Sequence, residues 1–104
     1  MSNKMKLTDY VVDFLEKKGI HDFFGYQGTM IAHLVDSIEK NPDARSHSSY
    51  NEQGAAFAAC GYAQAKDACG CAYATSGPGA ANLLSGVADA YFDSLPVIFI
   101  TGQL

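Results

Sequence analysis

The stretch GCAYATSGPGAANLLSGVADAYFDSLPVIFIT, residues 70–101, decides the fold. Residues 70–75 are small and apolar and have the length of a β-strand. A sharp turn follows at residues 76–79 (SGPG), and apolar residues recur at helical spacing over residues 80–92. Residues 96–101 are almost continuously apolar, which is typical of a strand buried on both faces of a parallel sheet. A strand, a helix and a second strand in this order predict two parallel strands joined by a crossover helix.

The residues before this unit continue the same alternation. The predicted elements are, in order, a helix capped by Thr8 and ended by Gly19, a strand over residues 21–26, a helix over 30–38, a strand over 45–50 and a helix over 52–66. The last helix is rich in alanine, so we expect it to pack tightly against a neighbour. This order predicts an α/β fold with an open, doubly wound, mostly parallel sheet and helices on both faces. Because the chain ends directly after a strand, we expect residues 1–104 to be a partial N-terminal domain whose sheet is incomplete at its C-terminal end.

Charge and hydrophobicity exclude two classes of partner. The chain has a formal net charge of −4, and its seven Lys and Arg residues are scattered rather than gathered in a basic stripe, so we expect no nucleic acid partner. The longest uncharged stretch, residues 68–87, is interrupted by Gly and Pro and does not predict a membrane span. Residues 1–8 lack the apolar core of an export signal.

The three cysteines, Cys60, Cys69 and Cys71, have no disulfide framework spacing. An odd number of cysteines indicates reduced thiols, from which we predict a cytoplasmic location. Cys69 and Cys71 would face the same side of a strand, but no His or second Cys pair stands at a useful spacing, so buried structural residues are favoured over a metal site. The histidines are spread over three elements, and no catalytic role is assigned to them.

In open α/β sheets, ligands bind at the carboxyl ends of the strands. Three segments occupy such ends, at residues 25–28, 50–54 and 75–79, and the last two each open a helix whose free N–H groups can hold an anion. Gly77 and Gly79 are open to a second interpretation, in which they only permit the tight turn. A dinucleotide fingerprint is disfavoured, because the third glycine is missing and no acidic residue ends the next strand.

Glu52 is also open to two interpretations. An acidic residue in the first turn of a helix is stabilised by the helix dipole, and this structural role is common. The alternative is a functional carboxylate at the edge of the sheet. Without further information, the structural interpretation is favoured.

Five segments together resemble a known family. They are residues 50–56 (YNEQGAA), 61–63 (GYA), 74–83 (ATSGPGAANL), 88–96 (ADAYFDSLP) and 100–103 (ITGQ). In this order and spacing they resemble the N-terminal, pyrimidine-binding domain of thiamine-diphosphate enzymes, in the group that includes acetolactate synthase, pyruvate oxidase and oxalyl-CoA decarboxylase. The resemblance covers nearly the whole chain. It implies an enzyme that decarboxylates and ligates 2-keto acids.

The resemblance also implies site residues. Glu52 matches the glutamate that contacts the N1′ atom of the cofactor's aminopyrimidine, so it is the predicted catalytic residue. A carboxyl group held in a mostly apolar pocket can share a proton with a ring nitrogen. The predicted cofactor-binding residues are Gln27, Gly28, Glu52, Pro78 and Asn82.

The chain departs from the family pattern in three places. Gln27 stands where relatives usually have proline, and Asn51 stands where a histidine is common. No Gly-Asp-Gly motif is present. In the family this motif helps to hold Mg²⁺ on the cofactor's diphosphate, so we expect Mg²⁺ in the complete enzyme and no metal site in this chain.

The resemblance implies that the active site is completed by the diphosphate-binding domain of a second subunit, in a homo-oligomer that is a dimer or a tetramer. The chain by itself should then be inactive. The alternative function is a stand-alone or split-subunit α/β module that binds a nucleotide or a partner protein without catalysis.

Overall fold

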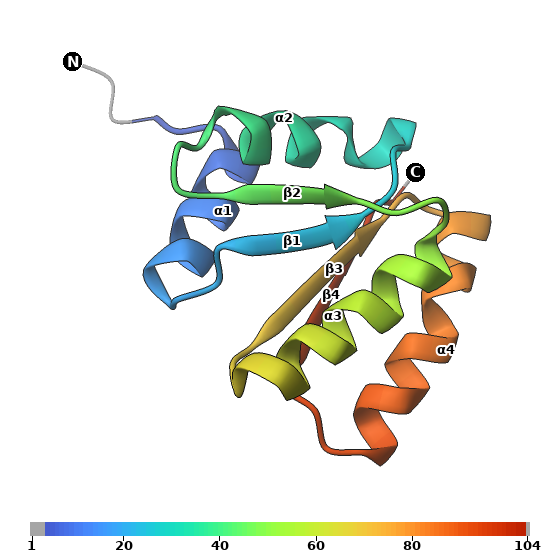
Figure 1. Cartoon of the computed structure of the whole chain (residues 1–104). Helices are drawn as coiled ribbons and strands as arrows, with labels where there is room; N and C mark the ends of the chain where they lie inside the picture. The colour runs from blue at the N-terminus through green and yellow to red at the C-terminus, as the bar shows by residue number, and fades with distance from the viewer. Residues whose placement is uncertain (1–3, 104) are drawn as a thin grey trace.

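The computed structural model describes residues 4–103, which form a four-stranded sheet with helices on both faces (Figure 1). The predicted domain of residues 1–104 includes residues 1–3 and 104, which lie outside the described part. The prediction that residues 1–8 carry no export signal falls partly on residues 1–3 as well. The elements are, in chain order, α1 (Leu7–Lys17), β1 (Asp22–Gly25), the 3₁₀ helix η1 (Thr29–Ile31), α2 (Ala32–Lys40), β2 (Arg45–Ser48), α3 (Glu52–Lys66), β3 (Gly70–Ala74), α4 (Pro78–Phe92) and β4 (Val97–Thr101). This order confirms the predicted α/β fold.

The strands lie in the order β2-β1-β3-β4, and every neighbouring pair is parallel. The chain passes from β1 through α2 to β2 at one edge of the sheet, and from β3 through α4 to β4 at the other. The crossovers that follow the neighbouring strands β1 and β3 therefore run in opposite directions. α1 and α2 cover one face, and α3 and α4 cover the other (Figure 1). Such a reversal of strand order is the place where open α/β sheets bind ligands.

The central strand β3 is buried along its whole length and contributes to two apolar cores. Cys71 and Tyr73 belong to the core beneath α1 and α2, whereas Ala72 and Ala74 belong to the core beneath α3 and α4. The first core contains large side chains: Val12, Leu15, Ile20, Phe23, Ile31, Leu34 and Ile38. The second contains mostly small ones: Ala56, Ala59 and Leu83. Helices α3 and α4 can therefore lie closer to the sheet and to each other.

Two glycines mark these close approaches. A Cβ atom on Gly86 of α4 would lie 2.3 Å from the Cβ of Ala56 in α3. A Cβ atom on Gly70 of β3 would lie 2.4 Å from the backbone oxygen of Ala59. Any larger residue would push the backbones apart, so the expected tight packing of the alanine-rich helix is confirmed.

Some boundaries and exposures differ from the sequence predictions. Thr8 does not cap α1, because the helix begins at Leu7 and the Thr8 hydroxyl pairs with Ser37 Oγ at 2.7 Å. The helix predicted over residues 30–38 begins with a 3₁₀ turn. Helix α4 begins at Pro78 rather than at residue 80, because a proline has the backbone angle that the first helical position requires.

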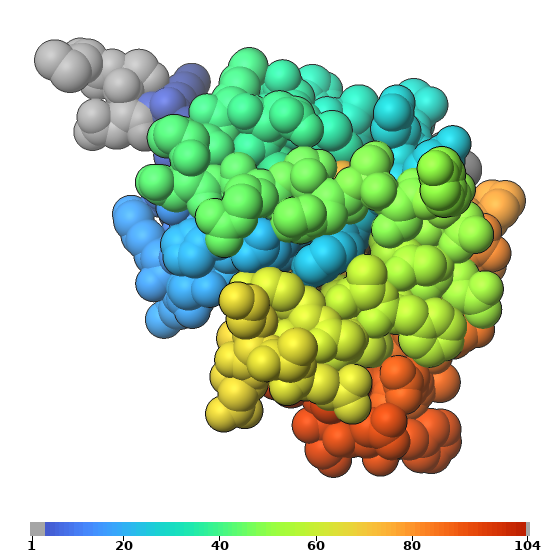
Figure 2. Space-filling view, in the orientation of Figure 1, coloured from blue at the N-terminus to red at the C-terminus, as the bar shows by residue number. Residues whose placement is uncertain are grey.

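Two apolar surfaces are more exposed than their sequences suggest. The side chains of Leu84 and Tyr91 on α4 are 64% and 79% exposed. Strand β4 is only partly buried, because it lies at an edge of the sheet. Figure 2 shows α3 (yellow-green) and α4 (orange) side by side at the surface.

None of the helices within residues 4–103 is long and apolar enough to cross a membrane.

A buried carboxylate, Asp22, connects neighbouring elements at the amino-terminal ends of β1 and β2. Arg45 donates to it through Nε and Nη2 at 2.8 and 2.9 Å, His47 Nε2 lies 2.7 Å away, and Tyr62 Oη donates at 3.1 Å. The hydrogen bond from Arg45 is the main cause that holds the pKa of Asp22 well below its usual range. This cluster ties β1 to β2 and α3, at the end of the strands opposite to the predicted site.

Replacing Asp22 with Asn should lower the free energy of unfolding at pH 7 by about 1–3 kcal/mol, because a charged acceptor of several hydrogen bonds is lost. The pKa of Asp22 is lower in the folded chain than in the unfolded one. Its stabilisation is therefore complete above the unfolded value of about 4 and is lost as the pH falls toward the folded value. Urea unfolding should show a smaller difference between wild type and variant at pH 3 than at pH 7. An equal difference at both pH values would contradict this account.

Replacing Gly86 with Ala should lower the free energy of unfolding by about 1–3 kcal/mol, because the added methyl group overlaps Ala56. Gly61→Ala is the matched control: Gly61 lies inside α3, and a Cβ there would meet nothing within 4 Å. That control should gain up to about 1 kcal/mol from helix propensity. Denaturant unfolding of both variants tests the prediction, and effects of the same sign would argue against a contact that depends on Gly86.

Candidate functional site

Three loops meet at the carboxyl edge of the sheet, after β1, β2 and β3. Figure 1 shows that α3 and α4 both begin at this edge. The loops comprise residues 26–28, 49–51 and 75–77. The free N–H groups at the starts of two long helices therefore lie beside the point where the strand order reverses, which favours a polar or anionic ligand there.

Glu52 is the first residue of α3 and is only 9% exposed. The preceding residue, Asn51, is the N-cap, and its side chain accepts a hydrogen bond from Gly54 N at 2.7 Å. Glu52 instead reaches across to α4, where Asn82 Nδ2 donates to its Oε1 at 3.0 Å. Because Asn51 caps the helix, the cap does not require the Glu52 side chain. A buried carboxylate with a neutral amide as its hydrogen-bond donor is unusual on purely structural grounds.

The two glycines of the Gly-Pro-Gly turn are required for different geometric reasons. Gly77 has a φ of +69°, in the region that favours glycine. A Cβ atom on Gly79 would lie 2.7 Å from Thr75 Cγ2 and 3.3 Å from Glu52 Oε2. The turn therefore does more than reverse the chain, because Gly79 lets the start of α4 lie directly beside the Glu52 carboxylate. Pro78, between them, is exposed at the first position of α4.

Thr75 joins the loops that follow β1 and β3. Its Oγ1 accepts a hydrogen bond from the backbone N–H of Met30 at 3.2 Å. A Cβ atom on Gly28 would lie 2.3 Å from Thr75 Cβ, so glycine is needed for this contact. Thr75 was predicted only as part of the segment 75–79 and not as a site residue, although its position at the end of a strand, before the glycine-proline turn, was a usable signal.

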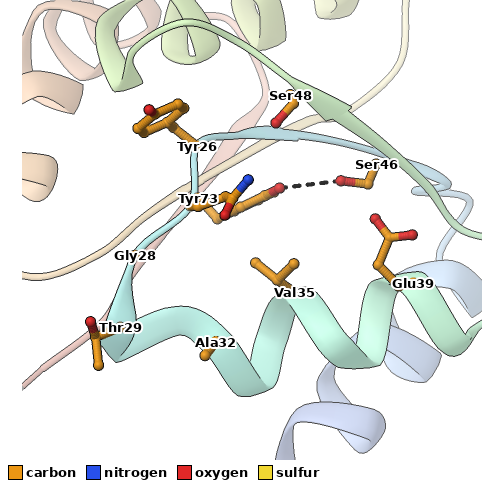
Figure 3. Close-up of a pocket in the computed structure, with 10 residues that line it drawn as sticks. Tyr26, Gly28, Thr29, Ala32, Val35, Glu39, Ser46, Ser48 and Tyr73 are labelled. Carbon is orange, nitrogen blue, oxygen red and sulfur yellow. Dashed lines mark hydrogen bonds between the residues drawn. The ribbon is translucent and has the colours of Figure 1, made fainter.

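A groove of about 760 Å³ lies on the face covered by α2. Figure 3 shows Val35 and Glu39 of α2 on one side and Ser46 and Ser48 of β2 on the other. Tyr73 reaches across β1 to pair with Ser46 Oγ at 3.2 Å. Its ring lies where a Cβ atom on residue 25 would be, which explains the glycine at that position.

The predicted cofactor residues fall into two groups. Glu52 and Asn82 are in direct contact, and Gly28 is connected to them through Thr75 and Gly79. Gln27 lines the groove on the α2 side, and the lining of that groove includes none of Glu52, Pro78 and Asn82. The loop after β1 therefore forms one wall of the groove and also contacts the Glu52 side of the edge through Gly28.

Cysteine and histidine side chains do not gather near this edge. In the part of the chain that the structure describes, no three His, Cys, Asp or Glu side chains are grouped closely enough to hold a metal ion. Burial raises the pKa of Cys71 to about 12, so its thiol stays protonated and is a poor metal ligand. His47 is part of the Asp22 cluster at the opposite end of the sheet.

Replacing Thr75 with Val should keep the side-chain shape but remove the acceptor for Met30 N–H. We expect the Met30 amide to exchange with deuterated solvent about fivefold faster, since one hydrogen bond is worth about 1 kcal/mol. The control Thr75→Ser keeps the hydroxyl, so the Met30 amide should exchange as slowly as in the wild type. Unchanged exchange in the valine variant would mean that this hydrogen bond does not join the loops.

The chain matches the model of one protein family, described as thiamine pyrophosphate enzyme, N-terminal TPP binding domain, over residues 5–104. It is 46% identical over 98 residues to a probable acetolactate synthase 2, chloroplastic, of Oryza sativa subsp. japonica, covering 94% of this chain and 15% of that protein. It is 43% identical over 99 residues to acetolactate synthase 2, chloroplastic, of Nicotiana tabacum, and 41% identical over 99 residues to acetolactate synthase, chloroplastic, of Arabidopsis thaliana. Each of these two matches covers 95% of this chain and 15% of the relative.

These names contradict the predicted cytoplasmic location, because each of these relatives is named chloroplastic. The prediction was based on the unpaired cysteines. Reduced thiols indicate reducing surroundings and do not identify one compartment. The cysteine count was therefore the wrong observation from which to infer a location.

The family match and the relatives confirm the resemblance found in the five sequence segments. The chain spans about 15% of the length of these relatives. The matched part includes the carboxyl edge that carries Glu52, Asn82 and the glycine-proline turn. The chain belongs to the family of the N-terminal thiamine pyrophosphate binding domain of thiamine pyrophosphate enzymes.

Proposed function

We propose that residues 1–104 are part of the pyrimidine-binding domain of a thiamine-diphosphate enzyme that decarboxylates and ligates 2-keto acids, as the names of its acetolactate synthase relatives suggest. The observation that carries the proposal is the buried Glu52 carboxylate, held by Asn82 beside Gly79 at the carboxyl edge of the sheet. In this proposal Glu52 is the catalytic residue of the chain. It contacts the N1′ atom of the aminopyrimidine and shares a proton with it.

The residues at this edge fit a flat polar ring. Gly79 presents backbone without a side chain next to Glu52 Oε2, and a Cβ there would crowd that oxygen at 3.3 Å. The carboxylate offers an acceptor or, when protonated, a donor to a ring nitrogen. Burial keeps water from competing for this hydrogen bond, which strengthens it.

Each part of the edge has a separate task in the proposed site. Glu52 exchanges a proton with the ring nitrogen, as a general acid and base. Gly28, Pro78 and Asn82 form the wall around it, and Gln27 approaches from the other side of the same loop. Thiamine diphosphate, when bound, supplies the electron sink for decarboxylation of a 2-keto acid.

The rest of the proposed site lies outside this chain. We infer that Mg²⁺ and the diphosphate are held by another domain, because the sequence has no Gly-Asp-Gly motif. That domain belongs to a second subunit of a homo-oligomer, a dimer or a tetramer. The exposed Leu84 and Tyr91 are seven residues apart and so lie on one face of α4, and they support an association of this kind, since exposed large apolar side chains on one face often mark interfaces.

Replacing Glu52 with Gln in the complete protein should lower the turnover of pyruvate by about a hundredfold or more, because a neutral amide cannot share a proton with the ring. The measurement is the release of carbon dioxide and the formation of acetolactate, with thiamine diphosphate and Mg²⁺ present. Asp43→Asn is the control for loss of a carboxylate, since Asp43 is exposed and lies before the start of β2, at the end of the sheet opposite to the proposed site. It should keep normal turnover, and both variants should unfold at the wild-type temperature. Normal turnover in the Glu52 variant would remove the basis of the proposed function.

A further inference from the structure

We infer that Asn82 is a positioning residue that decides which oxygen of the Glu52 carboxyl group carries the proton, an inference that rests on the proposed function. Asn82 lies one turn into α4, and its amide is directed at α3. Nδ2 donates to Glu52 Oε1 at 3.0 Å. The amide nitrogen is a donor and has no acceptor capacity, so Oε1 must accept. Because the carbonyl oxygen of a carboxylic acid is a better acceptor than its hydroxyl oxygen, this hydrogen bond favours Oε2 as the oxygen that carries a proton.

Oε2 is also the oxygen next to the bare backbone of α4. A Cβ on Gly79 would lie 3.3 Å from Oε2, closer than an ordinary van der Waals contact. The hydrogen bond from Asn82 and the missing side chain of Gly79 therefore have complementary effects. Asn82 occupies one oxygen, and Gly79 places no side chain against the other oxygen.

The hydrogen bond also limits the rotation of a flexible side chain. Glu52 has three side-chain torsions and stands at a helix start, where its carboxylate could otherwise turn to the free N–H groups of its own helix. Asn51 already accepts from Gly54 N, and Asn82 holds Oε1 from the neighbouring helix. A carboxylate held between two helices is in place before a ligand arrives, which favours proton transfer along one direction.

A second side-chain hydrogen bond between the same helices provides a matched control. Gln53 Nε2 donates to Ser85 Oγ at 3.2 Å, from the residue after Glu52 to a residue on the next turn of α4. Ser85→Ala removes a hydrogen bond that joins α3 to α4 without removing a partner of Glu52. A purely structural role for Asn82 would give Asn82→Leu and Ser85→Ala similar effects.

The first test uses the cofactor-free protein labelled with ¹⁵N-asparagine. The side-chain amide resonance of Asn82, assigned by its loss in Asn82→Leu, should shift in Glu52→Gln and stay in place in Ser85→Ala. A resonance that does not respond to Glu52→Gln would show that the two side chains do not interact, and would overturn the inference. This measurement does not depend on activity.

The second test measures the exchange of the C2 proton of bound thiamine diphosphate with deuterated solvent, in the complete protein with Mg²⁺. Asn82→Leu should slow this exchange about tenfold, whereas Ser85→Ala should leave it unchanged. The double variant Glu52→Gln/Asn82→Leu should be no slower than Glu52→Gln alone, because Asn82 acts through Glu52. Thermal unfolding verifies that Asn82→Leu is folded.

The outcomes separate this inference from the proposed function. If Glu52→Gln slows the exchange and Asn82→Leu does not, the positioning role is wrong and the proposed function stands. If the double variant slows the exchange by the product of the two single effects, Asn82 acts on the cofactor directly and the inference is also overturned. If Glu52→Gln itself leaves the exchange at the wild-type rate, the proposed function fails and the positioning role fails with it.

Discussion

The contact between Glu52 and Asn82 depends on how closely α3 and α4 approach each other. A side chain on residue 86 would overlap Ala56, and a side chain on residue 70 would overlap the backbone of Ala59. Small residues therefore bring two helix starts together at one edge of the sheet. A carboxylate on one helix can then meet an amide on the other at 3.0 Å. With larger residues in this core, the helices would be too far apart for a hydrogen bond between these two side chains.

Two buried carboxylates lie at opposite ends of the same sheet, and their partners differ. Asp22 is surrounded by donors that include a guanidinium group, and the pKa of this carboxyl is held low. It is fixed as an anion and joins strands to a helix. Glu52 accepts from a neutral amide, and its second oxygen lies beside Gly79. The first environment suits a structural role, whereas the second lies at the edge where strand order reverses, which is where open α/β sheets bind ligands.

The loop after β1 connects the proposed site with the groove beneath α2. Gly28 contacts Thr75, whose hydroxyl accepts from Met30 N–H, while Gln27 lines the groove. In the family resemblance, Gln27 stands where a proline is usual. A polar side chain at this position changes the lining of the groove but leaves the Glu52 contact intact. The departure at Gln27 therefore concerns the α2 side of the loop more than the carboxylate.

Local sequence signals determined the order of strands and helices, and the five family segments identified the family. The same segments predicted Glu52 as the catalytic residue. Apolar periodicity and turn residues depend on neighbours within one element, so they can be recognised in a linear sequence. The hydrogen bonds of Thr75 with Met30, of Asp22 with Arg45 and of Asn82 with Glu52 could not be found in this way, because the partners are 23 to 45 positions apart along the chain. The exposure of Leu84 on α4 was also hidden, since an apolar stripe does not reveal which part of it a neighbour covers. Only the folded sheet brings such distant groups within hydrogen-bonding distance, because the parallel strand order places the starts of α3 and α4 at one edge.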